Sequence, residues 1–277
     1  QTRDALSLMR CQSVRPGEIK YSQGTVIRAV REGFPAQAAV LSALLAREGV
    51  AGFEQPLEGK SGFYALYAGG QFAPEDLLGG LGENYWIDAL TFKRWPSCRG
   101  THAFIEMALA SGIGTSGGAA DDIAEIEVGI DAIQRMLCEP LPRKQAPQTA
   151  IDAKFSIPFT LALAFTRGRV GLDDFDATSL SDPAVLALAA KVKPVLAEGM
   201  DWGGCGGRLT IRLKDGREIA AAQDDALGCP ARPLGEAALV EKFLDCAARA
   251  QVPPCDAAGL AEAILSLETC GDVGAVF

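Results

Sequence analysis

The sequence predicts an α+β protein: a mostly helical body with an α+β domain inserted before the C-terminal helices. Three observations indicate this fold class. Residues 1–82 carry helical hydrophobic spacing, residues 83–233 mix strand-like with helical segments, and residues 234–277 are helical again. Such an order is typical of an α+β fold, not of alternating βαβ units. We therefore expect three segments with these boundaries.

Residues 1–82 show helical spacing that is broken by glycine and proline. The stretch Ala36–Ala46 is apolar nearly all round, which is typical of a helix buried in a bundle. Gly33 and Pro35 interrupt the pattern before it, and Glu48-Gly49 ends it. We expect helices at 4–12, ending at the break Arg15-Pro16-Gly17, and at 25–47, 60–70 and 74–81.

Residues 83–233 alternate between strand-like and helical character. Ile123–Ile130 alternates apolar and polar residues with a period of two, which predicts a half-buried strand. Leu209–Ala222 predicts a hairpin around Asp215-Gly216, a pair that suits a type I′ turn. A looser alternation predicts a strand at 85–94. Helices are expected at 101–111, from Pro158 to Gly168, at 236–249 and at 257–269. A further helix is expected to begin at the cap Ser181-Asp182-Pro183 and to end at Lys193, because Pro194 stops it.

Composition excludes several classes of function. The chain has 35 acidic and 26 basic side chains, and a net charge of −9 repels nucleic-acid backbones. No apolar run approaches the roughly 18–20 residues that cross a bilayer, so we expect no membrane segment. The eight cysteines form no C-x-x-C pair and there is one histidine, which argues against a zinc site. Without a visible signal peptide, we expect free thiols and a cytoplasmic location.

The segment Lys93–His102, KRWPSCRGTH, is the strongest candidate for a functional site. It places Lys93, Arg94 and Arg99 beside the only histidine of the chain, at the predicted start of a helix. Backbone N–H groups and the helix dipole favour bound anions there, and the same dipole favours a neutral imidazole. These features predict a carboxylate- or phosphate-binding hollow with His102 as the proton-transfer group. A solvated basic turn with a helix-capping histidine is the alternative.

Two further elements are candidates for anion binding. Arg28 and Arg31 are three residues apart, where their guanidinium groups could clamp a carboxylate, although solvated surface arginines are the alternative. Lys154 and Ser156 come just before the helix that Pro158 opens, and Ser156 could simply cap that helix. The glycine stretches at 112–118 and 203–207 lack the strand–turn–helix context of a dinucleotide loop, and we interpret both as ordinary loops.

The sequence resembles the MmgE/PrpD family, which includes 2-methylcitrate dehydratase, cis-aconitate decarboxylase and iminodisuccinate epimerase. Three stretches carry the resemblance, in the family's order. The first stretch, at 92–102, is FKRWPSCRGTH, which is similar to the family's K-x-[YW]-P-x-C-x-x-T-H motif. The second, at 152–175, is DAKFSIPFTLALAFTRGRVGLDDF. The third is the LTIRLKDGRE hairpin, followed by VEKF at 240–243. The resemblance implies a helical domain with a lid-like α+β domain, usually in a homodimer. It also implies that the helical domain starts well before this chain does, so that residues 1–82 are its C-terminal part.

The resemblance implies an active-site role for His102, which matches the histidine of the family's T-H pair, and for Lys93 at the start of the same motif. Arg28 and Arg31 stand where many members have a lysine and a histidine, and Phe159 stands where a tyrosine is common. Arginine does not titrate usefully, and phenylalanine lacks the hydroxyl group of tyrosine. These replacements therefore indicate a divergent member of the family.

We therefore expect a cofactor-independent lyase, without a bound metal, for a small di- or tricarboxylic acid. Dehydration of a 2-methylcitrate-like hydroxy acid is the leading candidate, and decarboxylation or epimerisation of a related polycarboxylate is the alternative. A catalytically incomplete chain or a structural, dimerising subunit is a hypothesis of another class. His102 and Lys93 would carry the catalysis, and seven residues would bind substrate: Arg28, Arg31, Arg94, Arg99, Thr101, Lys154 and Ser156.

Overall fold

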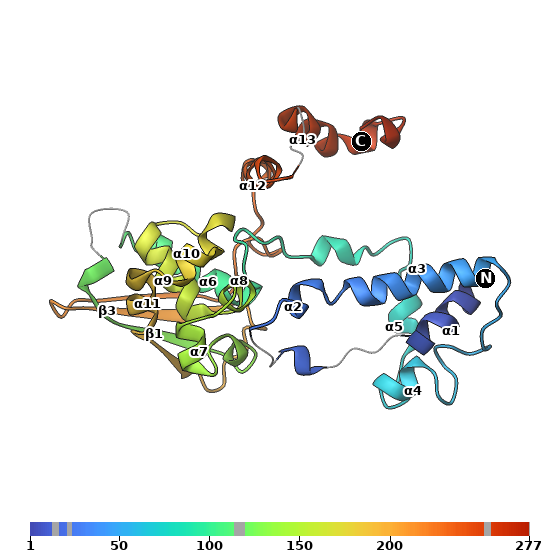
Figure 1. The fold of residues 1–277 in the computed structure, drawn as a ribbon, viewed down its shortest axis with the longest axis horizontal. Coiled ribbons are helices and arrows are strands. Elements are labelled where there is room, and N and C mark those ends of the chain that lie inside the picture. The colour runs from blue at the N-terminus through green and yellow to red at the C-terminus, as the bar shows by residue number, and fades with distance from the viewer. Residues whose placement is uncertain (13–16, 21–23, 114–119, 252–255, 277) are drawn as a thin grey trace. The chain divides into compact units, whose positions relative to one another are not determined.

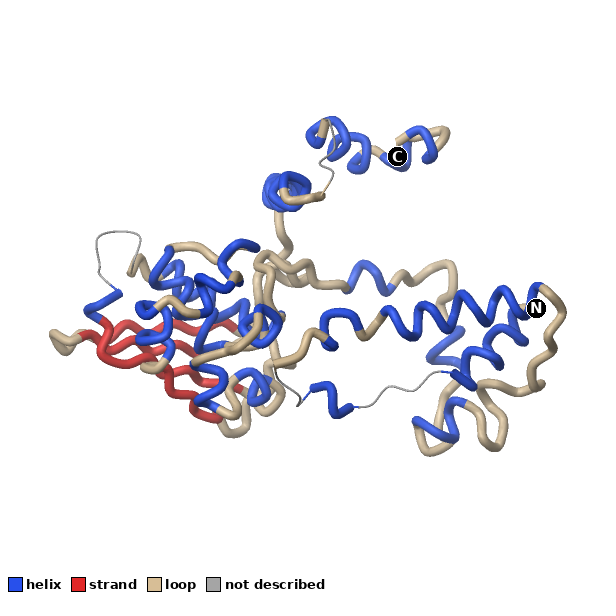
Figure 2. The backbone as a smooth tube through the Cα atoms, in the orientation of Figure 1, coloured by secondary structure: helices blue, strands red, loops and turns tan. Residues whose placement is uncertain are grey.

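The computed structural model describes residues 1–12, 17–20, 24–113, 120–251 and 256–276, and the chain divides into two compact units (Figure 1). Unit 1 comprises Gln1–Trp86 and Gln148–Asp152, and unit 2 comprises Ile87–Pro147 and Ala153–Phe277. Among the described residues, the strands lie in unit 2 and helices lie in both units (Figure 2). The predicted α+β class is confirmed. The return of residues 234–277 to the helical domain stays a prediction.

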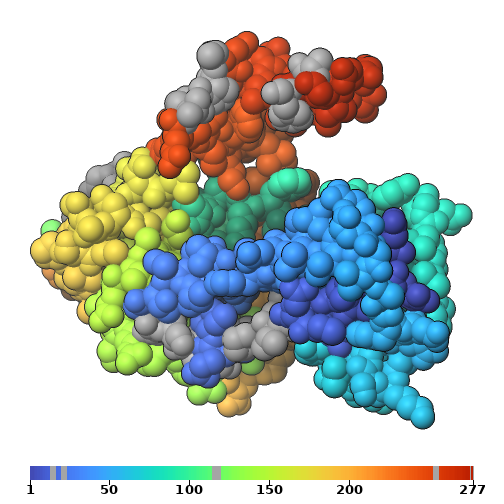
Figure 3. Space-filling model, turned by 45° about the vertical axis from the view of Figure 1, so that its right-hand side comes forward, coloured from blue at the N-terminus to red at the C-terminus, as the bar shows by residue number. Residues whose placement is uncertain are grey.

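Unit 1 is helical, and its helices bury little apolar surface. In α3 (Gly33–Arg47), a stripe of small side chains at every fourth residue, Ala38, Ser42 and Ala46, is buried, and α3 packs on α1 (Thr2–Gln12). The larger apolar side chains of α3, such as Val40 and Leu41, are exposed. Figure 3 shows the blue part of the chain, which contains α3, at the surface. The expectation that Ala36–Ala46 is buried on all sides is therefore wrong, because one neighbouring helix covers only one stripe.

Unit 2 is built on a four-stranded mixed sheet with the strand order β2-β1-β3-β4. β1 (Ile123–Ile130) pairs in parallel with β2 (Val192–Leu196) and antiparallel with β3 (Gly207–Leu213), which pairs antiparallel with β4 (Glu218–Gln223). The predicted alternation along β1 is confirmed, with every second residue from Ile126 to Ile130 buried. The buried side chains of the sheet form one core with three helices: α6 (His102–Ala110), α9 (Ile157–Arg167) and α11 (Pro183–Ala189).

Helix α9 begins and ends as the sequence predicts. Ser156 is its N-cap residue and accepts a hydrogen bond from the amide of Phe159, and Pro158 lies in the first turn. Gly168 ends the helix in the left-handed conformation with a φ of 62°. The side chains from Ile157 to Phe165 are all buried, so α9 is the helical centre of the unit 2 core.

Two predicted elements are wrong. Residues 85–94 form no strand; they contain a 3-10 helix, η2 (Trp86–Ala89), and then a loop in which Phe92 donates to the carbonyl oxygen of Gly228 at 2.9 Å. The helix that Pro183 opens ends at Ala189, and after a short turn the chain forms β2, which begins at Val192. Pro194 is tolerated in β2 because this strand lies at the edge of the sheet.

The hairpin of β3 and β4 is confirmed, but its turn is not type I′. A type I′ turn needs positive φ at both central residues. Gly216 has a φ of 88°, whereas no described residue other than glycine has a positive φ, which excludes Asp215. The amide of Leu213 instead donates to the carbonyl oxygen of Arg217 at 2.9 Å, so the loop holds three residues.

The remaining elements are short, apart from two helices near the C-terminus. The predicted C-terminal helices are confirmed as α12 (Glu236–Ala248) and α13 (Ala257–Leu265). No helix in the described part of the chain combines the length and apolar character that crossing a bilayer needs. The other elements are η1 (Gly17–Lys20), α2 (Ile27–Val30), α4 (Phe63–Tyr67), α5 (Pro74–Leu78), η3 (Arg99–Thr101), η4 (Ala120–Asp122), η5 (Gln134–Leu137), α7 (Leu141–Gln145), α8 (Ala150–Lys154), η6 (Leu172–Phe175), α10 (Ala177–Leu180), η7 (Leu267–Thr269) and η8 (Val273–Ala275).

Candidate active site

The chain turns sharply just ahead of His102. The 3-10 turn η3 leads directly into α6, which begins at His102, so the predicted helix start is confirmed. The Thr101 hydroxyl donates to the carbonyl oxygen of Cys98 at 2.8 Å and lies 2.7 Å from the hydroxyl of Ser97. Both hydroxyls belong to buried residues and satisfy polar groups of the turn. The substrate-binding role of Thr101 stays a prediction.

The imidazole of His102 is enclosed by the protein. Its exposed fraction is 0%, and the Trp95 ring stands edge-on to it with 5.2 Å between the ring centroids. Neither ring nitrogen makes a well-formed hydrogen bond to the described residues. A polar group buried in this way loses its hydration, and the loss is much larger for the charged imidazolium than for the neutral ring.

Burial is the main cause that lowers the pKa of His102 from 6.5 to about 4. The positive charge of Lys93 lowers this pKa further, and that of Lys242 does so to a smaller extent. The backbone of Ser97 and Trp95 lies close enough to raise the pKa, and it offsets part of the effect. His102 is therefore neutral at pH 7 and able to accept a proton.

Helix α12 reaches the same segment from the C-terminal part of the chain. Glu241 pairs with Arg94 at 2.9 Å, and the Nζ of Lys242 donates to the carbonyl oxygen of Lys93. Because its ammonium group also acts on His102, Lys242 belongs to the candidate site. Lys242 is not among the site residues that the sequence predicts. The signal that could have found it is the VEKF stretch, whose lysine it is.

The glycine stretch 203–207 forms a loop over residues 203–206, as predicted, and its last residue, Gly207, begins β3; the loop is bonded to the turn ahead of α6. The buried side chain of Gln134 joins the two, because its Nε2 donates to the carbonyl oxygens of Gly206 at 2.7 Å and of Gly100 at 3.2 Å. The buried carboxylate of Asp131 in turn accepts a hydrogen bond from the backbone N–H of Gln134 at 2.9 Å. Sequence reasoning missed both polar side chains. The other glycine stretch, 112–118, lies mostly outside the described residues.

Of the two residues that the sequence predicts to bind substrate here, Lys154 is the last residue of α8 and Ser156 is the N-cap of α9. The capping interpretation of Ser156 is confirmed: its hydroxyl accepts from the amide of Phe159 at 3.0 Å and donates to the carbonyl oxygen of Lys144 at 2.5 Å. The ammonium group of Lys154 lies 5.3 Å from the centroid of the Phe175 ring, a cation–π contact. Substrate binding by these two residues stays a prediction.

The predicted arginines lie in both units. Arg28 belongs to α2, and Arg31 follows it and pairs with Glu32 at 2.8 Å. Both belong to unit 1, whereas His102 belongs to unit 2, so their convergence on one site stays a prediction. In unit 2, Arg99 is exposed and donates to the hydroxyl of Thr91 at 3.2 Å.

Comparison with known proteins decides the family of this chain. The MmgE/PrpD C-terminal domain matches residues 95–268, and the MmgE/PrpD N-terminal domain matches residues 1–75. The chain belongs to the MmgE/PrpD family. The chain is 25% identical over 266 residues to the cis-aconitate decarboxylase-like protein oryM of Aspergillus oryzae (strain ATCC 42149 / RIB 40), and 24% identical over 256 residues to a cis-aconitate decarboxylase of Aspergillus terreus. These matches cover 90% and 87% of this chain and 53% and 51% of the relatives. The chain thus spans about half the length of the curated relatives it matches.

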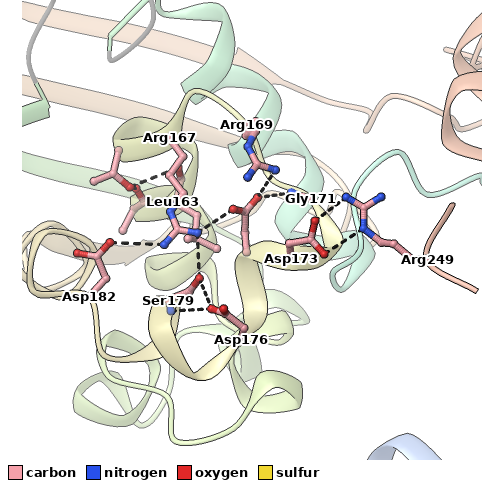
Figure 4. A network of polar contacts seen from close by, with 12 residues as sticks. Leu163, Arg167, Arg169, Gly171, Asp173, Asp176, Ser179, Asp182 and Arg249 are labelled. Carbon is pink, nitrogen blue, oxygen red and sulfur yellow. Dashed lines mark hydrogen bonds and ion pairs between the residues drawn. The ribbon is translucent and has the colours of Figure 1, made fainter. Parts of the chain in front are cut away.

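The end of the second MmgE/PrpD stretch forms an ionic network (Figure 4). Asp174, with an exposed fraction of 0%, accepts from the guanidinium groups of Arg167 at 2.7 Å and Arg169 at 3.2 Å. Arg167 also donates to the hydroxyl of Ser179 at 2.9 Å and to the carboxylate of Asp182 at 3.4 Å. These contacts join the end of α9 to η6, α10 and the start of α11. In this MmgE/PrpD chain the network fixes the connection between these four elements of unit 2.

A groove between α6 and the β3–β4 hairpin offers no match to the substrate class that the MmgE/PrpD resemblance implies. It is lined by side chains such as Met107, Leu209 and Ile219, and none of its lining residues is charged. A polycarboxylate needs cations, which this groove lacks. Across the described ranges, no three side chains of histidine, cysteine, aspartate or glutamate converge on a point that could hold a metal ion.

Proposed function

We propose that the protein is a lyase that acts on a small di- or tricarboxylic acid. The observation that carries the proposal is the neutral, buried imidazole of His102 with the ammonium groups of Lys93 and Lys242 acting on it. In a chain with a net charge of −9, such a local gathering of cations favours an anionic ligand. The family, and relatives that are cis-aconitate decarboxylases, support the same chemistry.

The physical difficulty of such reactions is charge. Loss of a proton or of carbon dioxide next to a carboxylate leaves an electron pair on carbon beside a group that is already anionic. Fixed cations lower this barrier, because they are in place before the charge develops. We assign this role to Lys93, with Arg94 and Arg99 from the same segment, and proton transfer to His102.

Two reactions fit this assignment. Dehydration of a 2-methylcitrate-like acid removes a proton from carbon, a step that the neutral His102 suits, and breaks the C–O bond at the neighbouring carbon, so that the hydroxyl group takes up a proton and leaves as water. Decarboxylation of a cis-aconitate-like acid is favoured by the relatives, and it needs a proton for the carbon after carbon dioxide leaves. A bound tricarboxylate would raise the pKa of His102, because nearby negative charge favours the imidazolium. His102 would then carry that proton.

Contact between His102 and a substrate requires a local movement. The imidazole has an exposed fraction of 0%, and the Trp95 ring lies against it. Because the turn from Trp95 to Thr101 carries the Trp95 ring, we propose that displacement of this turn uncovers the imidazole. We therefore propose that the carboxylate groups bind first at the exposed Lys93 and Arg99, and that the turn then opens toward the bound acid.

The test is a screen of the purified chain against cis-aconitate, 2-methylcitrate and aspartate-derived dicarboxylates, with products identified by NMR. We expect turnover of at least one acid, and we expect His102→Ala to lower kcat by about 10²-fold or more, the usual effect of losing an acid–base group. His102→Gln, which keeps a polar side chain of similar size, should be equally impaired. Wild-type turnover in both variants would rule out the assigned role.

The competing hypothesis is a catalytically incomplete chain, and the half-length match to the relatives favours it. In that case the chain would bind the acid, with saturable heat in calorimetry, but would not convert it. Failure to bind any of these acids would favour a purely structural role.

A further inference from the structure

We propose that Lys242 is a positioning residue of the candidate site. Its hydrogen bond to the carbonyl oxygen of Lys93 holds the backbone of that segment, and it brings a second ammonium group within electrostatic reach of His102. The inference deepens the proposed function and rests on it for the role of His102 in turnover. Its own test does not depend on turnover.

The contact between α12 and the site is made by consecutive residues on both sides. Glu241 pairs with the guanidinium group of Arg94, and Lys242 bonds to the neighbouring residue Lys93 through its backbone. Two adjacent contacts fix both the orientation of α12 and its distance from the segment that contains Lys93 and Arg94. A single surface ion pair would leave the helix free to rotate about it, and it contributes at most about 1 kcal/mol.

A second anchor holds the other end of α12. Arg249 binds Asp173 of η6 through two bonds, Nε to Oδ1 at 3.0 Å and Nη2 to Oδ2 at 2.5 Å (Figure 4). Such bidentate pairing adds geometric specificity. Arg249 follows Lys242 by seven residues, close to two helical turns, so both project from one face of α12. No residue of α12 is fully buried, and the polar contacts of Lys242 and Arg249 tie the helix to Lys93 and Asp173.

The charges around His102 come from several elements, but the two lysines act on it most strongly. On α6 itself, the negative charge of Glu106 is balanced by the guanidinium group of Arg232, which pairs with it at 2.5 Å. The charged side chains on the elements packed against α6 are Arg99 of η3, Arg167 of α9, Arg208 and Arg212 of β3, and Glu218 of β4. Removing the charge of Lys242 should therefore be visible at the imidazole.

The experiment uses the fact that His102 is the only histidine of the chain. Its imidazole NMR signals therefore report one titration without assignment. We expect Lys242→Met to raise the pKa of His102 by roughly 0.3 pH unit or more, the effect of a unit charge about 10 Å away in water. Lys93→Met should raise it further, because the charge of Lys93 has the larger effect.

Two control variants separate charge from folding. Lys242→Arg keeps the charge and the donor and should leave the titration unchanged. Lys214→Met removes a lysine from the β3–β4 turn and should also leave it unchanged. An unaltered titration in folded Lys242→Met, or an equal shift in Lys214→Met, would overturn the proposal. If the shift occurs but no acid is turned over, the proposed function fails and the positioning role stands.

Discussion

At the scale of single residues, the buried His102 makes the stability of the protein depend on pH. In the unfolded chain this imidazole binds a proton below about pH 6.5, whereas in the folded chain it does so only below about pH 4. The stabilising contribution is therefore fully present above pH 6.5 and is lost progressively as the pH falls to about 4. The lowering of the pKa of His102 from 6.5 to about 4 corresponds to about 3 kcal/mol of unfolding free energy.

Urea denaturation at a series of pH values checks this prediction. The unfolding free energy of the wild type should fall more steeply between pH 6.5 and pH 4 than that of His102→Gln, which has no group to protonate. Carboxylates titrate in both proteins, so the difference between the two curves isolates the histidine. Parallel curves would show that His102 has the same pKa in the folded and the unfolded chain, and they would contradict the lowered pKa.

The same scale shows what sequence could predict of the candidate site. His102 was identifiable because a lone histidine after three cations at a helix start is a local pattern. Lys242 and Gln134 were not, since each reaches the site across a large sequence separation, Lys242 to Lys93 and Gln134 to Gly100. Such contacts depend on tertiary packing, which a local pattern does not encode.

At the scale of elements, Gln134 holds the turn ahead of α6 against the glycine loop. Its amide group serves three buried backbone partners: the carbonyl oxygens of Gly100 and Gly206, and the amide of Asp131, which donates to Oε1 at 3.1 Å. Gln134→Leu leaves these groups unpaired, and each buried unpaired group costs about 1 kcal/mol or more. We expect a loss of about 3 kcal/mol of unfolding free energy, measured by urea denaturation at pH 7.

Gln145→Leu is the matched control for this variant. The Gln145 amide also donates to two carbonyl oxygens, of Ala190 and Val192, each at 3.2 Å, but its side chain is partly exposed. Water can replace the lost bonds there, so we expect a loss of about 1 kcal/mol or less. Equal losses in the two variants would contradict the structural role of Gln134.

Elements with a strong local pattern can be predicted from the sequence, and the errors lie where the pairing of strands determines the structure. β1 and α9 follow their periodicity and caps. The sequence predicts that the residues just before Pro194 end a helix, because proline breaks helices, but an edge strand such as β2 also accepts proline. The predicted type of the turn at Asp215-Gly216 is wrong, because the same dipeptide also fits a three-residue loop with one glycine at positive φ.

At the scale of the whole molecule, the apolar core is unevenly distributed. Among the described residues of unit 1, the buried apolar side chains are small, Ala38, Ala46 and Pro56, whereas the main core cluster lies in unit 2. A helix that buries only small side chains gains little from packing, and helices of this length are marginal alone in water. Unit 1 should therefore open locally more often than unit 2.

Hydrogen exchange of the full chain tests this difference. We expect amides of α1 and α3 to exchange about 10²-fold faster than those of α9 and β1, because local opening of unit 1 exposes little additional apolar surface. The predicted homodimer adds a second arm to the experiment. If a second copy covers the exposed side chains of α3, such as Val40 and Leu41, protection of α3 should rise with protein concentration. Protection of α3 equal to that of α9 at every concentration would contradict the marginal stability of unit 1, since it would require buried surface that the described residues of unit 1 do not provide.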